Sequence, residues 1–139
     1  MVEITDGTSN TILYGEKYAR CSSTSLSLDG GSFWAYSVFR AVDLPPPMNP
    51  TPTPRPFSPG FAIPFRPWPN VIGPGSRFQV QPSPFLGNSD PTRASTAHGS
   101  GMLVCLADGS VRTLAPSMSG DTWWAAVTPS GGEVLGSDW

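Results

Sequence analysis

The sequence has little charge and few of the side chains that enzymes commonly use. Charged residues make up 13% of its 139 residues, the net charge is −2, and the chain has one histidine and two cysteines. This charged share is about half of that in a typical soluble domain. A nucleic-acid-binding surface needs clustered lysine and arginine, which this composition does not supply. We therefore expect no nucleic-acid partner.

Long hydrophobic runs are also missing. No stretch is long enough to span a membrane, and no signal peptide precedes the first motif. The chain opens directly in the segment Ile4–Asn10, which has the turn residues of an ordered structure, so we expect that an N-terminal portion is missing from it. A chain of 139 residues can form one domain with a single modest core, so we expect residues 1–139 to be one unit.

Proline and glycine, by contrast, are abundant, with 17 and 15 residues. Residues 44–91 form a proline- and aromatic-rich excursion. In its proline runs, residues 44–47 and 50–56, proline excludes helix and central strand and favours polyproline II or irregular extended backbone. Aromatic residues are interleaved with the prolines, which favours packing against this subunit or a neighbour. The residues that we expect to take part in self-association are Pro50, Pro52, Pro54, Phe57, Phe61, Phe65, Trp68 and Trp124.

Strand and turn patterns lie on both sides of the excursion. We expect strands over residues 11–18, 32–39, 102–107, 110–114 and 133–135, turns at residues 6–7, 29–31 and 108–109, and a short helix over 122–127 capped by Ser119 or Asp121. The strand over 102–107 is apolar on both faces and is typical of a central strand. The sequence therefore predicts a mainly β fold with a minor α part, built on an antiparallel sheet with a short C-terminal helix.

His98 is the only histidine in the sequence, and Asp108 follows it ten residues later. The intervening strand would separate them by roughly 20 Å, so we do not expect a catalytic pair. Asp108-Gly109 has the composition of a hairpin turn with positive φ, and His98 is expected to make a structural hydrogen bond. The sequence also has no nucleophile elbow, phosphate loop, zinc motif or carboxylate pair, so we expect no enzyme activity.

Two further groups of residues leave alternatives open. Asp6, Ser9 and Asn10, together with Glu16, offer oxygen ligands for a calcium ion, the one cofactor that the sequence suggests. The alternative is an Asx-turn in which Asp6 satisfies its own backbone. Cys21 and Cys105 allow one disulfide, and the alternative is two small buried thiols.

Three segments carry a resemblance to a known family. They are Ile4-Thr-Asp-Gly-Thr-Ser-Asn-Thr-Ile-Leu-Tyr-Gly-Glu16, then His98-x9-Asp108-Gly109-Ser-Val-Arg112, and a tail with Thr122-Trp123 and Gly131-Gly-Glu-Val134. They resemble the pilin-like proteins abundant in planctomycetes, named after a prepilin-type processing-associated His-x9-Asp-Gly signature, a domain of unknown function. Family members usually begin with a prepilin leader and a long hydrophobic helix, which this sequence lacks. The resemblance implies a pilin-like globular head, secreted or on the cell surface, with no known catalytic activity.

Two functions remain open from the sequence. The first is an extracellular structural subunit of a bacterium, which assembles with copies of itself or with other pilin-like subunits, into filaments, through the excursion and the sheet edges. The second is a carbohydrate- or surface-binding module that presents exposed tryptophan to a glycan.

Overall fold

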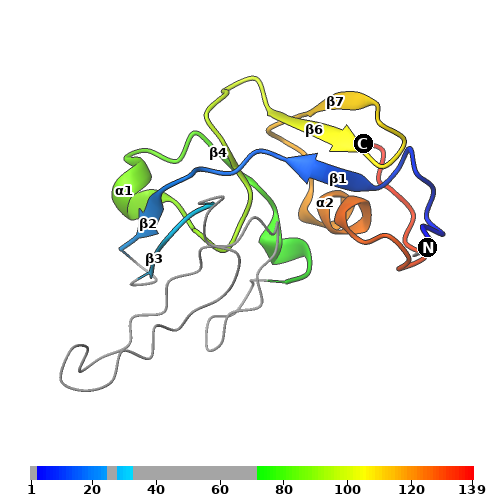
Figure 1. Cartoon of the computed structure of the whole chain (residues 1–139), viewed down its shortest axis with the longest axis horizontal. Coiled ribbons are helices and arrows are strands. Elements are labelled where there is room, and N and C mark those ends of the chain that lie inside the picture. Colours follow the sequence, from blue (N-terminus) through cyan, green and yellow to red (C-terminus); the bar gives the residue numbers. More distant parts are fainter. Residues whose placement is uncertain (1–2, 25–27, 33–71) are drawn as a thin grey trace, which may run out of the picture.

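The structure is a computed structural model, and it describes residues 3–24, 28–32 and 72–139. The candidate residues Pro50, Pro52, Pro54, Phe57, Phe61, Phe65 and Trp68 lie outside this part, as do residues 33–39 of one expected strand. In chain order the elements are β1 (Ile12–Gly15), β2 (Cys21–Ser23), β3 (Leu28–Gly30), η1 (Pro74–Ser76), β4 (Gln79–Val80), α1 (Phe85–Asn88), β5 (Ser95–Thr96), β6 (Met102–Leu106), β7 (Val111–Leu114) and α2 (Gly120–Val127) (Figure 1).

The main sheet has three antiparallel strands in the order β1-β6-β7. Met102 pairs with Leu114 and Cys105 with Val111, while Ile12 of β1 pairs with Leu106. The strands predicted over 102–107 and 110–114 are thus confirmed, with β6 in the centre, and β1 is shorter than the strand predicted over 11–18. Together with few helical residues, this sheet confirms the mainly β, antiparallel class of the fold.

The β6–β7 hairpin turns at the predicted place but with one residue more than a two-residue turn. The Gly109 amide donates to the carbonyl of Leu106 at 3.0 Å, and the Leu106 amide donates to Ser110 at 2.9 Å. Gly109 has a φ of 86°, whereas Asp108 does not have a positive φ. The loop is therefore a three-residue connection with glycine in the left-handed position, a common hairpin geometry.

Just before β6, the backbone at Gly101 passes very close to the backbone of β7. Its φ is +131°, and a Cβ at this position would lie 2.0 Å from the carbonyl oxygen of Leu114. Only glycine fits there without moving β7, because a side chain would collide with main-chain atoms.

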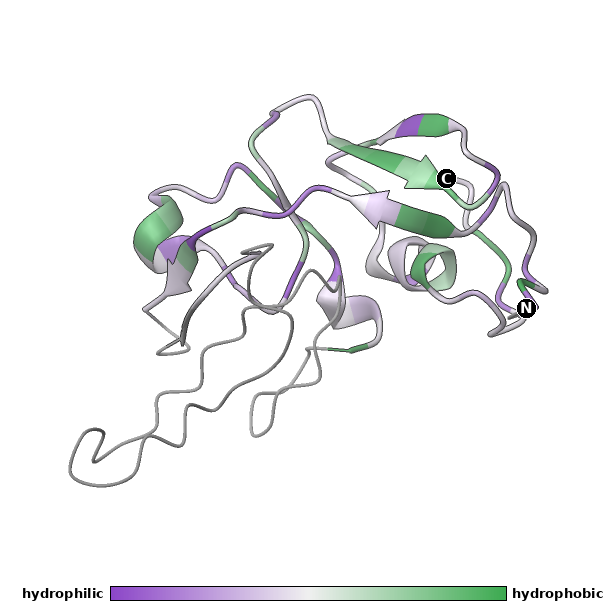
Figure 2. Cartoon of the chain, in the orientation of Figure 1, coloured by the Kyte–Doolittle hydropathy of each residue, from purple (hydrophilic) through white to green (hydrophobic). Residues whose placement is uncertain are grey.

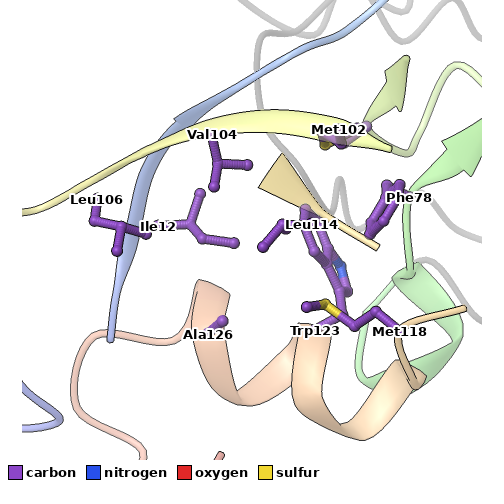
Figure 3. Close-up of a cluster of buried hydrophobic side chains, with 10 residues drawn as sticks. Ile12, Phe78, Met102, Val104, Leu106, Leu114, Met118, Trp123 and Ala126 are labelled. Atoms are coloured by element: carbon purple, nitrogen blue, oxygen red, sulfur yellow. The ribbon is translucent and has the colours of Figure 1, made fainter. Parts of the chain in front are cut away.

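The hydrophobic core lies between one face of the main sheet and α2 (Figure 3). Trp123 of α2 is completely buried and meets Phe78 edge-on, with ring centroids 5.2 Å apart. Of the two predicted caps, Ser119 is the one that caps the helix: its hydroxyl accepts a hydrogen bond from the amide of Thr122 at 3.2 Å. The remaining core residues are Ile12, Ala94, Met102, Val104, Leu106, Leu114, Met118 and Ala126.

The described part of the excursion, residues 72–91, belongs to the body of the domain. β4 pairs in parallel with β5, and Phe78, just before β4, is a core residue. Phe85 of α1 contacts Tyr18 edge-on, with ring centroids 6.5 Å apart. The aromatic side chains at this end of the excursion therefore pack against the same subunit.

Two of the predicted secondary-structure elements are wrong. The turn expected over residues 29–31 is occupied by β3, whose Asp29 and Gly30 pair with Ser22 and Cys21 of β2. The strand expected over 133–135 is not a strand, because this tail is held by side-chain contacts instead of a ladder. Leu135 and Trp139 pack against the core, and Asp138 accepts a hydrogen bond from the Ser119 amide at 2.6 Å.

None of the helices in the described ranges has the length and hydropathy needed to cross a membrane.

Candidate functional site

The first and second motif segments lie side by side as one antiparallel ladder, β1 against β6. At one end the amides of Ala107 and Asp108 donate to the carbonyls of Thr11 and Thr8, at 2.8 and 3.1 Å. At the other end the Leu103 amide donates to Oε2 of Glu16 at 3.3 Å. The two motifs therefore form a single structural unit that is fastened at both ends.

Glu16 also contacts His98, at the end of the β1–β6 ladder where β6 begins. Nε2 of His98 lies 3.2 Å from Oε1 of Glu16, with 58% of the histidine side chain and 29% of the glutamate side chain exposed. The Glu16 carbonyl accepts from the Ser95 amide at 3.1 Å, and the His98 amide donates to the hydroxyl of Thr96 at 3.0 Å. No local pattern indicates this partner for His98, because the two residues are far apart along the chain.

This geometry gives the spacing of the second motif a structural reason. His98 precedes β6 and Asp108 follows it, so the nine residues between them contain one full strand and its approach. The Asp108 carboxylate accepts from the amide and hydroxyl of Ser110, at 2.9 and 2.6 Å, and these bonds hold the pKa of Asp108 below its ordinary value. His98 and Asp108 are thus placed at opposite ends of β6, in two separate structural roles.

We expect Glu16→Ala to lower the free energy of unfolding by about 1 kcal/mol, because it removes the acceptor of the Leu103 amide and the partner of His98 together. His98→Ala removes only the exposed contact and should cost less than half as much. Urea unfolding of the two variants and the wild type provides the comparison. Equal losses in the two variants would show that Glu16 does not hold the ladder together through Leu103.

Of the four residues suggested for calcium, Asp6, Ser9 and Asn10 lie in one turn, whereas Glu16 contacts Leu103 and His98. The Asp6 carboxylate accepts from the amides of Gly131 and Gly132, at 2.8 and 3.0 Å, and so ties the N-terminal motif to the C-terminal tail. Asn10 donates its side-chain amide to the Asp6 carbonyl at 3.0 Å, while Glu16 is engaged at the far end of β1. Among the described residues no group of three acidic, histidine or cysteine side chains could hold a metal. The turn of Asp6 and Asn10 thus anchors the tail, and the calcium site stays a prediction.

No disulfide joins Cys21 and Cys105, so the disulfide alternative does not hold in this structure. Cys21 is buried in β2 of the small β2–β3 sheet, and Cys105 is half-buried in β6 of the main sheet.

Lys17 is a half-buried charge that sequence reasoning did not single out. Burial lowers the pKa of Lys17 from 10.5 to about 8, although the charges of Cys21 and Asp90 act in the opposite direction. The residue comes directly after Glu16 at the end of the first motif, and no sequence signal separates it from a solvated lysine.

We expect the stability of the protein to rise with pH because of Lys17. Below pH 8 the ammonium is charged in both states and its burial destabilises the fold; between about pH 8 and 10.5 the unfolded chain holds more protons, so the free energy of unfolding increases with pH. The rise should be on the order of 2 kcal/mol, after a reduction for partial exposure. Lys17→Met should remove this rise in urea unfolding at pH 7.5 and 10. If the free energy of unfolding of Lys17→Met rises with pH as much as that of the wild type, another group causes the rise.

The face of the main sheet opposite the core carries exposed apolar side chains. Figure 2 shows the hydrophobic colouring of β6 and of the first part of β1. Leu13 is 51%, Tyr14 67%, Leu103 46% and Val111 71% exposed. Tyr14 and Val111 both pair with Cys105, so they flank it on this outer face. The sequence predicted β6 as a central strand that is apolar on both faces. It is central in the sheet, and its inner face alone is covered by the described residues. We call Leu13, Tyr14, Leu103 and Val111 the outer face.

The outer face is bounded by an unpaired strand edge. β7 is the last strand of the main sheet, and no backbone hydrogen bond within the described ranges reaches its free side. An exposed edge next to apolar side chains is a template for pairing with another chain. This combination is the feature of the described surface best suited to bind a protein partner.

Comparison with known families shows to which family the chain belongs. A family model described as a protein of unknown function (DUF1559) matches residues 1–120. The chain belongs to this family. The DUF1559 match covers both motif segments that form the β1–β6 ladder and the residues between them. No curated protein and no solved structure matches the chain.

Proposed function

We propose that this DUF1559 protein is a pilin-like structural subunit outside a bacterial cell, on its surface or secreted, and not an enzyme. It assembles with copies of itself or with other pilin-like subunits. The observation that carries the proposal is the exposed apolar outer face next to the free edge of β7. Exposed apolar patches of this kind in soluble domains mark sites of protein–protein contact.

The arrangement of the motifs supports the proposal. The most distinctive residues, Glu16, His98 and Asp108, hold the ladder together and do not converge on a cavity. These motif residues thus stabilise the main sheet, and its outer face and β7 edge can contact other molecules. An antiparallel partner strand on β7 would satisfy the free main-chain groups and extend the outer face.

The experiment is sedimentation velocity over a wide concentration range, followed by electron microscopy of the largest species. We expect a concentration-dependent series of assemblies, with filaments or tubes among them. A single monomer species at all concentrations would reject the proposal.

The glycan-binding alternative receives less support. Trp123 is completely buried, and the guanidinium of Arg112 lies 4.4 Å from the centroid of the Trp139 ring. Of the three C-terminal tryptophans, only the half-buried Trp124 has neither of these restraints. A glycan-dependent change in tryptophan fluorescence of a monomeric protein would favour this function.

A further inference from the structure

A second surface feature lies away from the outer face, where the loop after β1 meets the segment between β4 and α1. It is an open groove of about 740 Å³. Its walls include Tyr18, Pro82, Pro84 and Phe85, and Arg20 and Gln81 supply polar groups. Tyr18 and Phe85 stand edge-on to each other, and the Tyr18 hydroxyl donates to the Thr96 carbonyl at 3.3 Å, which fixes the ring in place.

The chemistry of this groove fits a proline-rich strand. Extended polyproline II segments are recognised by shallow grooves of aromatic rings and prolines, and the entropic cost is low because the ligand is already extended. A charged residue beside the prolines commonly sets the direction of such a ligand through an ion pair at the rim. The groove has both elements, an aromatic and proline wall and the guanidinium of Arg20.

The chain itself carries a matching ligand sequence. Asp43-Leu44-Pro45-Pro46-Pro47 joins an acid to three consecutive prolines, and Asp43 is the one acidic residue between residues 33 and 71. Arg20 is exposed and makes no ion pair with any residue that the structure describes. The charges of the groove and of this sequence are therefore complementary.

We propose that the groove binds the Asp43–Pro47 segment of a second copy of this chain, with Asp43 paired to Arg20 and the prolines against Tyr18 and Phe85. This inference rests on the proposed function, since it names one contact by which subunits join. The contact is heterologous, because a groove on one copy takes a segment of the next. Contacts of this kind form open chains when they do not close into a ring, as a filament requires.

The test is a charge exchange in the full chain, measured by sedimentation velocity. Arg20→Glu and Asp43→Arg should each weaken association by about fivefold or more, because each replaces an attraction with a repulsion. The double variant, Arg20→Glu with Asp43→Arg, should recover most of the wild-type association. Asp121→Arg, which reverses an exposed charge on α2 outside both the groove and the β7 edge, is the matched control for Asp43→Arg and should leave association unchanged.

A labelled peptide spanning residues 41–50 gives a second readout. It should bind the wild-type chain, bind Arg20→Glu at least about fivefold more weakly, and bind Arg20→Glu again when the peptide carries Asp43→Arg. If the charge substitutions change neither the association constant nor the affinity for the peptide, the groove contact is rejected. The proposed assembly function would not be affected by that result. A wild-type chain that stays monomeric would reject the assembly function, and the peptide titration would then decide the groove by itself, with absence of binding rejecting it.

Discussion

Trp123→Ala should remove about 3–5 kcal/mol of stability, the largest loss from any single side chain in the described core. Trp123 is completely buried between α2 and the main sheet and packs edge-on against Phe78. A small domain has a total stability of only about 5–15 kcal/mol, so the variant should be largely unfolded at moderate temperature. Urea unfolding followed by circular dichroism measures the loss.

The neighbouring Trp124 supplies the matched control. It lies on the same helix but is half-buried, and it is not part of the core cluster. Trp124→Ala should therefore cost about 1 kcal/mol or less. Trp123→Phe, which keeps an aromatic ring in the core, should fall between the two alanine variants and gives a folded variant for comparison. Similar losses in Trp123→Ala and Trp124→Ala would contradict the packing of α2 through Trp123.

Val111→Lys should abolish most self-association without unfolding the protein. Val111 is 71% exposed, at the start of the β7 edge and on the outer face, so a charge there would be buried by any strand that pairs with the edge. Natural sheets use lysine at edge strands to prevent such pairing. We expect association to weaken by tenfold or more, which is roughly 1.4 kcal/mol, in sedimentation velocity.

Val134→Lys is the control for this change. Val134 is 92% exposed in the C-terminal tail, outside the main sheet, so the same substitution adds the same charge away from the proposed interface. It should leave association unchanged, and both variants should unfold within about 0.5 kcal/mol of the wild type. Equal effects of the two lysines on association would point to net charge and away from the β7 edge.

Local signals in the sequence predicted the centre of the fold well. The alternation in Val111–Leu114 and the Asp108-Gly109 pair specify a hairpin, and Ser119 marks the start of α2. These features depend on neighbours along the chain. The β6–β7 hairpin and its helix could therefore be predicted from composition and spacing.

Features that depend on distant parts of the chain could not be predicted in the same way. The parallel pairing of β4 with β5 and the Glu16–His98 contact join segments that are far apart, and neither has a local pattern. Leu103 and Val111 are apolar, so the sequence favours burial for them, and only the strand order shows that their face is open. The Leu135 tail is apolar like a strand, but its partners are side chains of the core.

Amide hydrogen exchange of β7 as a function of protein concentration tests assembly through the sheet edge most directly. If subunits pair through the free edge, the amides of Val111 and Thr113, which point away from β6, should become more protected as assemblies form, while amides in α2 keep the protection that they have in the monomer. Assemblies that form without any change in β7 would contradict pairing at this edge and place the contact between subunits elsewhere.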